Sequence, residues 1–498
     1  MRRGILTLVI AVCGNLWGQG SGLSDGSTPL HWAVHEGNLT EVQNEIKAGA
    51  NVNARTEFGV TPLSEAVAVN NTAIIKALLD AGAEPNALHY DGQTALMVVA
   101  RSTNVGAAKL LIAKGADPNI AEKQKNQTAI MWAAAQSRGP MVKVLLDAGA
   151  NPNAQTVINE IPAQVSAEPR AQYRSYGGLT SLMYAAREGC VDCLRDLIRS
   201  GAKLNKADPE GVTPLILAIN NFHFDAAKLL IESGADVNKW DWWGRGPLYI
   251  AADVNTIPRG GRADSPSTDV TSSLQIIEML LKRGANPNLQ LKLLSPFRSV
   301  GADRGVDLLL TTGTSPLLRA AKGLDAPAVK LMLQYGGNAN LPQVRGVTPT
   351  MAAAGMGSVD ADTRGRYDTP DTAKRATETL KLLLDNGGEL MGRDARGQTA
   401  LHAAAFWGWN DTVEFLASRG ADLNAKDGRG LTPIDSAMGR NGGNSRGGAR
   451  VDVHQDTADL LVKLGATPVV PPPPALAKPA GAKPVAGAKP AAPAKPVQ

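Results

Sequence analysis

A short pattern of apolar and polar residues recurs along most of the chain, at the spacing of two helices joined by turns. Each repeat carries two thin apolar faces. Examples are Leu30, Ala33 and Val34 in a first helix and, one repeat later, Ile74, Ile75, Leu78 and Leu79 in a second. A pair of helices this small cannot bury its own apolar face, so adjacent pairs must stack. The pattern predicts an all-α solenoid whose core grows along one axis.

The signals that start and stop these helices recur with the same period. First helices begin with a capping Thr and often a Pro at the next position, as in Thr28-Pro29-Leu30-His31. Second helices end before a Gly in segments such as Gly82-Ala83-Glu84-Pro85-Asn86, where we expect positive φ at the Gly. Eleven anchors of the first kind occur, most of them 33 residues apart.

These two linked motifs resemble the ankyrin repeat over residues 24–467. With the long insertions and the leader described below, the chain is similar to secreted bacterial ankyrin-repeat proteins. The resemblance implies about eleven helix–turn–helix units separated by β-hairpin fingers. It also implies that partner contacts lie at the finger tips and at the ends of the first helices.

Five breaks in the period predict insertions, near residues 155–178, 254–272, 289–312, 357–377 and 439–455. The first and third fall in fingers, and the others fall between the two helices of a unit. Long loops on a rigid scaffold are common sites of function. They also cost little stability, so neutral drift explains them equally well.

The two ends of the chain differ from the repeats. Residues 1–20 have a basic start, an apolar run and small residues before a cut after Gly20, which predicts a secretory signal peptide. An uncleaved anchor and a lipoprotein modified at Cys13 are the alternatives. Residues 468–498 are a Pro/Ala/Lys tail that we expect to be disordered. It acts either as a spacer or as a cationic strap on an anionic envelope surface.

The net charge of +5 comes from these ends, because Arg2, Arg3 and four tail lysines carry the excess and the repeats are almost neutral. We therefore expect the repeats to bind no nucleic acid. The protein is also expected to be a monomer. No motif for a cofactor or for catalysis is present.

Two side-chain pairs have a spacing that occurs in reactive sites. Cys190-Val191-Asp192-Cys193 is a CxxC segment, which suits either a redox couple or simple core packing, and we favour packing. There is no second CxxC for zinc. His31 and His35 lie one helical turn apart without a third ligand. The resemblance implies that His31 and His402 make local hydrogen bonds, so we expect no metal.

Scarce aromatic residues mark the candidate contact surface. Trp242 and Trp243 are expected at the tip of one finger. Between the two long fingers, they would share a polar trough with Arg187, Glu188, Asn220, Asn221 and Arg245. Alternatively, both Trp side chains pack on the second long finger, around Leu291, Leu293, Leu308 and Leu309. A second candidate group is Phe406 and Trp407, beside Trp409, at the end of a first helix.

Together these features predict a non-catalytic scaffold, exported to the periplasm or the medium, that presents a concave surface to a protein partner. The alternative is an envelope-tethered spacer held by the basic tail.

Overall fold

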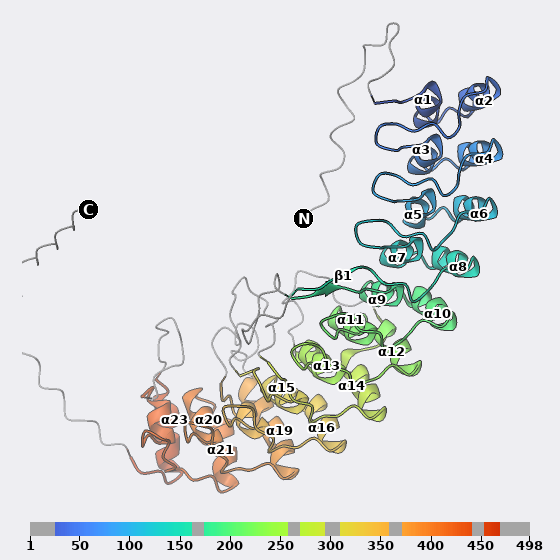
Figure 1. Ribbon diagram of the computed structural model, residues 1–498. Coiled ribbons are helices and arrows are strands. Elements are labelled where there is room, and N and C mark those ends of the chain that lie inside the picture. The colour runs from blue at the N-terminus through green and yellow to red at the C-terminus, as the bar shows by residue number, and fades with distance from the viewer. Residues whose placement is uncertain are drawn as a thin grey trace, which may run out of the picture.

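The computed structural model describes residues 25–161, 174–256, 269–293, 309–357, 371–440 and 453–468. These ranges hold a curved stack of paired helices and almost no strand, so the predicted helical solenoid is confirmed (Figure 1). The predicted signal peptide, nearly all of the predicted tail, half of the first insertion and most of each other insertion lie outside the described residues.

The helices alternate between two rows along the arch, as Figure 1 shows most clearly from α1 to α8. The inner row consists of α1 (Pro29–His35), α3 (Pro62–Ala68), α5 (Ala95–Ala100), α7 (Ala129–Ala135), α9 (Ser181–Arg187), α11 (Pro214–Asn220), α13 (Pro247–Thr256), α15 (Pro316–Lys322), α17 (Pro349–Ala353), α20 (Ala400–Phe406) and α22 (Pro433–Ala437). The outer row consists of α2 (Leu39–Lys47), α4 (Thr72–Asp80), α6 (Val105–Ala113), α8 (Gly139–Asp147), α10 (Val191–Arg199), α12 (Phe224–Glu232), α14 (Ser273–Lys282), α16 (Ala326–Gln334), α19 (Thr372–Asp385), α21 (Asn410–Ser418) and α23 (Gln455–Lys463).

The inner helices begin and the outer helices end as the sequence predicts. The Thr61 hydroxyl accepts a hydrogen bond from the Ser64 amide, and Pro62 occupies the first helical position of α3. The hydroxyl satisfies one of the donors that a helix start leaves unpaired, and Pro62 removes another because it has no backbone N–H. After α4, Gly82 has a φ of +89°, a conformation that is strained for residues with a β-carbon.

The core is a continuous apolar layer between the two rows of helices. In the first pair, Leu30 and Val34 are fully buried. In the second pair, all four apolar positions of α4 that the sequence singles out are buried. Each inner helix packs on the next inner helix, and each outer helix on the next outer helix. Burial therefore depends on neighbours throughout.

A ladder of asparagine side chains joins consecutive pairs. The Asn53 amide donates to the carbonyl of Gly82 (3.1 Å), and its oxygen accepts from the amide of Glu84 (2.8 Å). The same two bonds recur at Asn86, Asn119, Asn153, Asn238, Asn288 and Asn340. The ladder continues across the insertions, so the added residues leave the stack in register.

Where the insertions are described, they extend existing elements. The first ends in a two-stranded antiparallel ribbon, in which β1 (Ile158–Asn159) pairs with β2 (Tyr176–Gly177). The fourth contributes to α19, which has 14 residues where most outer helices have nine. Among the described helices, none has the length and hydropathy needed to cross a membrane.

Candidate functional site

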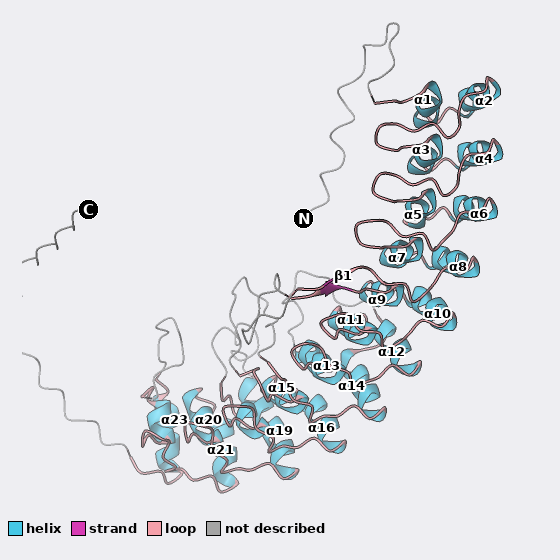
Figure 2. Ribbon diagram, viewed as in Figure 1, coloured by secondary structure: helices cyan, strands magenta, loops and turns pink. Residues whose placement is uncertain are grey.

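The connections between one pair and the next form fingers on the inner side of the arch, drawn as pink loops in Figure 2. We define the finger edge as residues 54–60, 87–93, 120–127, 154–161, 174–179, 206–212, 239–245, 289–293, 309–314, 341–347, 391–398 and 425–431. Many fingers turn around one acidic side chain. In the finger with the Trp cluster, the buried Asp241 carboxylate accepts from the amides of Trp243 (3.1 Å) and Arg245 (2.9 Å). It also pairs with the Arg245 guanidinium at 2.7 Å.

Trp243 is half-buried and is clasped between two guanidinium groups. The Cζ atoms of Arg174 and Arg245 each lie 4.7 Å from its ring centroid. Arg174 comes from the end of the first insertion and also pairs with Glu210 of the intervening finger (2.9 Å). The Trp243 carbonyl accepts from the amide of Lys292 (2.9 Å). Trp243 therefore links its own finger to two others, and Arg174 extends the cluster to the intervening finger.

This arrangement separates two residues that the sequence analysis treats alike. The Trp243 carbonyl accepts hydrogen bonds from the backbone amides of Lys292 and Leu293 in the second long finger. The packing of both Trp side chains on that finger stays a prediction. Leu308, from the same alternative, lies outside the described residues. Trp242 keeps 43% of its surface exposed, and Trp240, which the analysis left out of the site, keeps 45%. Of the predicted pair, Trp242 is the more exposed.

The inner-helix residues of the predicted trough lie at helix ends. Arg187 is exposed at the end of α9, pairs with Glu188 (2.8 Å) and stacks on the Tyr184 ring. Asn220 and Asn221 end α11 and are half-buried, and the Asn221 amide donates to the Leu217 carbonyl. The structure thus puts these residues on one row of consecutive inner helices.

A chain of contacts that the sequence analysis missed leads into this row. Arg101 lies 4.3 Å from the centroid of the Trp132 ring, and the Trp132 indole donates to Gln127. The Gln127 amide in turn donates to the Tyr184 hydroxyl (2.8 Å). Trp132 and Tyr184 both stand four residues after a capping Thr. Comparing that position across repeats would have revealed them.

Exposed apolar side chains concentrate on the fingers. Of the 16 large hydrophobic residues that are exposed in the described chain, ten belong to the finger edge: Phe58, Leu88, Tyr90, Val157, Ile158, Tyr176, Trp240, Trp242, Val344 and Met391. Several are aromatic residues one or two positions before the turn glycine. This signal is readable in the sequence.

Carboxyl groups beneath the Trp cluster have perturbed acidities. Burial raises the pKa of Asp208 to about 6, although its carboxylate accepts hydrogen bonds from the amides of Val212 and Glu210. Burial also raises the pKa of Glu210, against the opposing charge of Arg174. Both acids make contacts within the fingers, Asp208 with turn amides and Glu210 with Arg174.

The family follows from a match over most of the repeats. A model described as "Ankyrin repeats (3 copies)" matches residues 3–89, 63–156, 182–291 and 372–470, which is more than half of the chain. The chain belongs to the ankyrin-repeat family. Ankyrin repeats generally mediate protein–protein interaction. Among solved structures, the ankyrin repeat domain of Bcl-3, "a unique member of the IkappaB protein family", matches with 23% identity and a TM-score of 0.39. The match covers 51% of this chain and 99% of that domain. No curated protein matches the chain.

In this ankyrin-repeat protein the second aromatic group packs inward. The Trp407 indole donates to the Gly355 carbonyl of the preceding repeat (2.9 Å), and its ring stacks on the buried Trp409. Phe406 meets Trp407 edge-on and is half-buried. Trp407 therefore packs against the preceding repeat and against Trp409.

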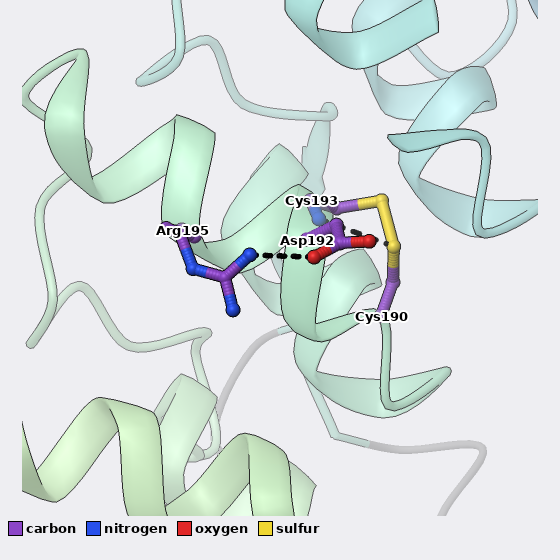
Figure 3. Close-up of a disulfide and its surroundings, with 4 residues drawn as sticks. All are labelled: Cys190, Asp192, Cys193 and Arg195. Carbon is purple, nitrogen blue, oxygen red and sulfur yellow. Dashed lines mark hydrogen bonds and ion pairs between the residues drawn. A yellow bond between two sulfur atoms is a disulfide. The ribbon is translucent and has the colours of Figure 1, made fainter. Parts of the chain in front are cut away.

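The cysteine pair of the ankyrin-repeat protein forms a disulfide between Cys190 and Cys193, at the start of α10 (Figure 3). Cys193 is fully buried, as its predicted core position requires. Asp192, between the two cysteines in the sequence, pairs with Arg195 (2.5 Å). The sequence left open whether this bond forms.

The two histidines that stand one helical turn apart bind different groups. His31 contacts the Thr28 hydroxyl (2.9 Å) and the Val60 carbonyl (3.2 Å), whereas His35 pairs with Glu65 (2.7 Å). His402 repeats the His31 pattern with Thr399 and Leu431. Within the described ranges, no three His, Cys, Asp or Glu side chains gather as a metal site.

Proposed function

We propose that this ankyrin-repeat protein is a non-catalytic scaffold that acts outside the cytoplasm and binds a protein partner along its finger edge, around Trp242. The observation that carries the proposal is the concentration of exposed apolar side chains on the fingers. Exposed apolar side chains that gather on one face mark interaction sites more reliably than scattered ones. Trp side chains are favoured anchors within such sites.

The proposed contact surface includes the ends of the neighbouring inner helices. Arg187 and Glu188 are exposed, and Asn220 and Asn221 are partly exposed, so polar groups flank the apolar tip. A polar rim around an apolar anchor is typical of protein interfaces that form and dissociate. Trp243 and Arg245 support the surface from below by fixing the finger. Phe406 and Trp407 are left out of it, because Trp407 is bonded to the preceding repeat.

Site-specific photo-cross-linking tests this function directly. A photoreactive amino acid replaces Trp242 in the full-length protein, in the cells that make it. The matched control carries the same group at Lys228, which is exposed on the outer helix α12. We expect a discrete protein adduct from position 242 and none from position 228. Equal labelling from both positions, or from neither, would contradict a partner on the finger edge.

The alternative role, a spacer tethered by its tail, predicts a different outcome for a truncated protein. Deleting residues 468–498 leaves the finger edge intact. A scaffold should still form the adduct at position 242, whereas a tethered spacer should no longer attach to the envelope. Fractionation of the same cells tests the export, with a mature chain beginning near Ser21 expected in the envelope or the medium. Full-length chain in the cytosol would rule the export out.

A further inference from the structure

The finger edge carries a strong charge imbalance that the nearly neutral repeats conceal. Its described residues include two exposed acids, Glu57 and Glu160. They include eleven exposed bases: Arg55, Lys123, Lys125, Lys206, Lys239, Lys292, Arg345, Arg393, Arg396, Lys426 and Arg429. The finger edge holds seven more acids and two more bases, all buried or half-buried, which makes 13 bases and nine acids in all. Its exposed surface is therefore basic.

The imbalance arises because the fingers use their acids internally. Asp394 accepts from the amides of Arg396 and Gln398, and Asp427 accepts from those of Arg429 and Leu431. Asp208 and Asp241 do the same in their fingers. Short acidic side chains are suited to such turns. The turn chemistry thus draws carboxylates inward and leaves the bases at the surface.

We infer that the partner on the finger edge is an acidic polypeptide segment with exposed apolar side chains. Neighbouring fingers stand about 8–10 Å apart, the spacing of packed helices, which is close to the Debye length of about 8 Å at physiological salt. Their positive potentials therefore add along the arch and attract a negative partner. This inference rests on the proposed protein-binding function and specifies the chemistry of that partner.

The apolar side chains between the bases favour a polypeptide over a nucleic acid. Half of the ten exposed apolar side chains on the finger edge are aliphatic, and these pack against other apolar side chains but offer no stacking platform for bases: Leu88, Val157, Ile158, Val344 and Met391. No finger has more than two exposed bases, which is sparse beside a nucleic-acid strand with about one phosphate every 3.4 Å. The chain's own tail is excluded as the occupant because it contains lysines and no acid.

Charge reversal on the finger edge tests the inference. The finger variant combines Lys206→Glu, Lys239→Glu and Lys292→Glu in the full-length protein. The matched control makes the same charge change on outer helices, with Lys109→Glu, Lys228→Glu and Lys330→Glu, all exposed. The probe is a fluorescent peptide of Glu, Phe and Ser, measured by anisotropy beside the same peptide with Gln in place of Glu. Oligothymidylate and phosphatidylglycerol vesicles complete the set.

We expect the finger variant to weaken binding of the acidic peptide at least about tenfold at low salt, and the control variant to weaken it less than about twofold. Raising the salt should weaken the wild type more steeply than the finger variant. Thermal melts verify folding, and a Lys→Gln version of the finger variant replaces it if reversal unfolds the chain.

Three results would overturn the inference. These are equal affinity for the Glu and Gln peptides, equal weakening by both variants, or tighter finger-dependent binding of oligothymidylate or vesicles. Failure here is distinguishable from failure of the proposed function. If cross-linking at position 242 captures a partner whose binding survives the finger variant, the scaffold role stands and the acidic partner does not.

Discussion

Arg174 lies over the ring of Trp243, with its Cζ atom 4.7 Å from the ring centroid, although the two residues belong to fingers that are not consecutive. The contact closes the end of the first insertion onto the finger of the Trp cluster. Together with the ion pair between Arg174 and Glu210, it makes the insertion part of the scaffold.

Trp243→Ala is expected to lower the unfolding free energy by about 2–3 kcal/mol, because the ring fills the space between two guanidinium groups. Arg174→Met, which keeps the aliphatic stem, should cost about 1 kcal/mol. A double-mutant cycle followed by thermal melts measures their coupling, expected near 1 kcal/mol. Additive effects would show that the stacked geometry contributes nothing.

Trp242→Ala is expected to act on binding instead. Trp242 is 43% exposed, so truncation should leave the melting temperature nearly unchanged. Binding of the partner that cross-linking identifies should weaken by about 2 kcal/mol. Titration of that partner against the variant measures the effect. Trp243→Ala is the matched comparison. A large melting shift for Trp242→Ala with unchanged affinity would move the contact surface elsewhere.

Asp208→Asn should change how stability depends on pH. The folded pKa of Asp208, about 6, lies above the unfolded value near 3.8, so between these pH values the unfolded chain releases a proton that the folded chain keeps. The wild-type unfolding free energy therefore falls as pH rises through this window, by about 2 kcal/mol after allowance for solvent screening. Asn retains an oxygen for the turn amides and has no proton to release.

Urea unfolding of both proteins from pH 3.5 to 7.5 measures this difference. The variant should gain on the wild type across the window and not beyond it. Because Glu210 also has a raised pKa, some slope will remain in the variant. Parallel pH profiles for the two proteins would refute the assignment.

Gly355→Ala should destabilise the chain by about 3 kcal/mol or more, from two causes. Gly355 has a φ of +93°, and an added β-carbon would lie 2.6 Å from Cδ1 of Trp407. Gly49→Ala is the matched control, since its φ is +87° and nothing lies within 4 Å of the added atom. Thermal melts of both variants separate backbone strain from the clash. Equal losses would mean that Trp407 yields without cost.

Cys193→Ser, or reduction of the wild type, should lower the unfolding free energy by about 2 kcal/mol, because even a short cross-linked loop restricts the unfolded chain. In the Ser variant, a hydroxyl also replaces a fully buried thiol. Affinity for the partner should not change, since the bond lies at the start of an outer helix. Melts with and without reductant, beside partner titration, measure both effects. Partner affinity that follows the redox state would reveal a switch.

The sequence by itself determined the solenoid, because each repeat carries local signals for its own helices. Thr61, Pro62 and Gly82 act within a few residues of where they stand, and the apolar spacing in α4 fixes which face must be covered. It also fixed that Cys193 is buried, since that position belongs to the same apolar face.

Only the tertiary structure decided how the fingers meet. Arg174 reaches Trp243 through an insertion whose path no periodicity describes, so the sequence could not separate the clasped Trp243 from the exposed Trp242. The charge of the finger edge was likewise hidden. The net charge of the sequence counts every carboxylate equally, whereas the charge at the surface depends on which carboxylates the turns bury. The buried Asp241 and the exposed Lys239 stand two residues apart, and the fold of the turn determines which of them a partner meets.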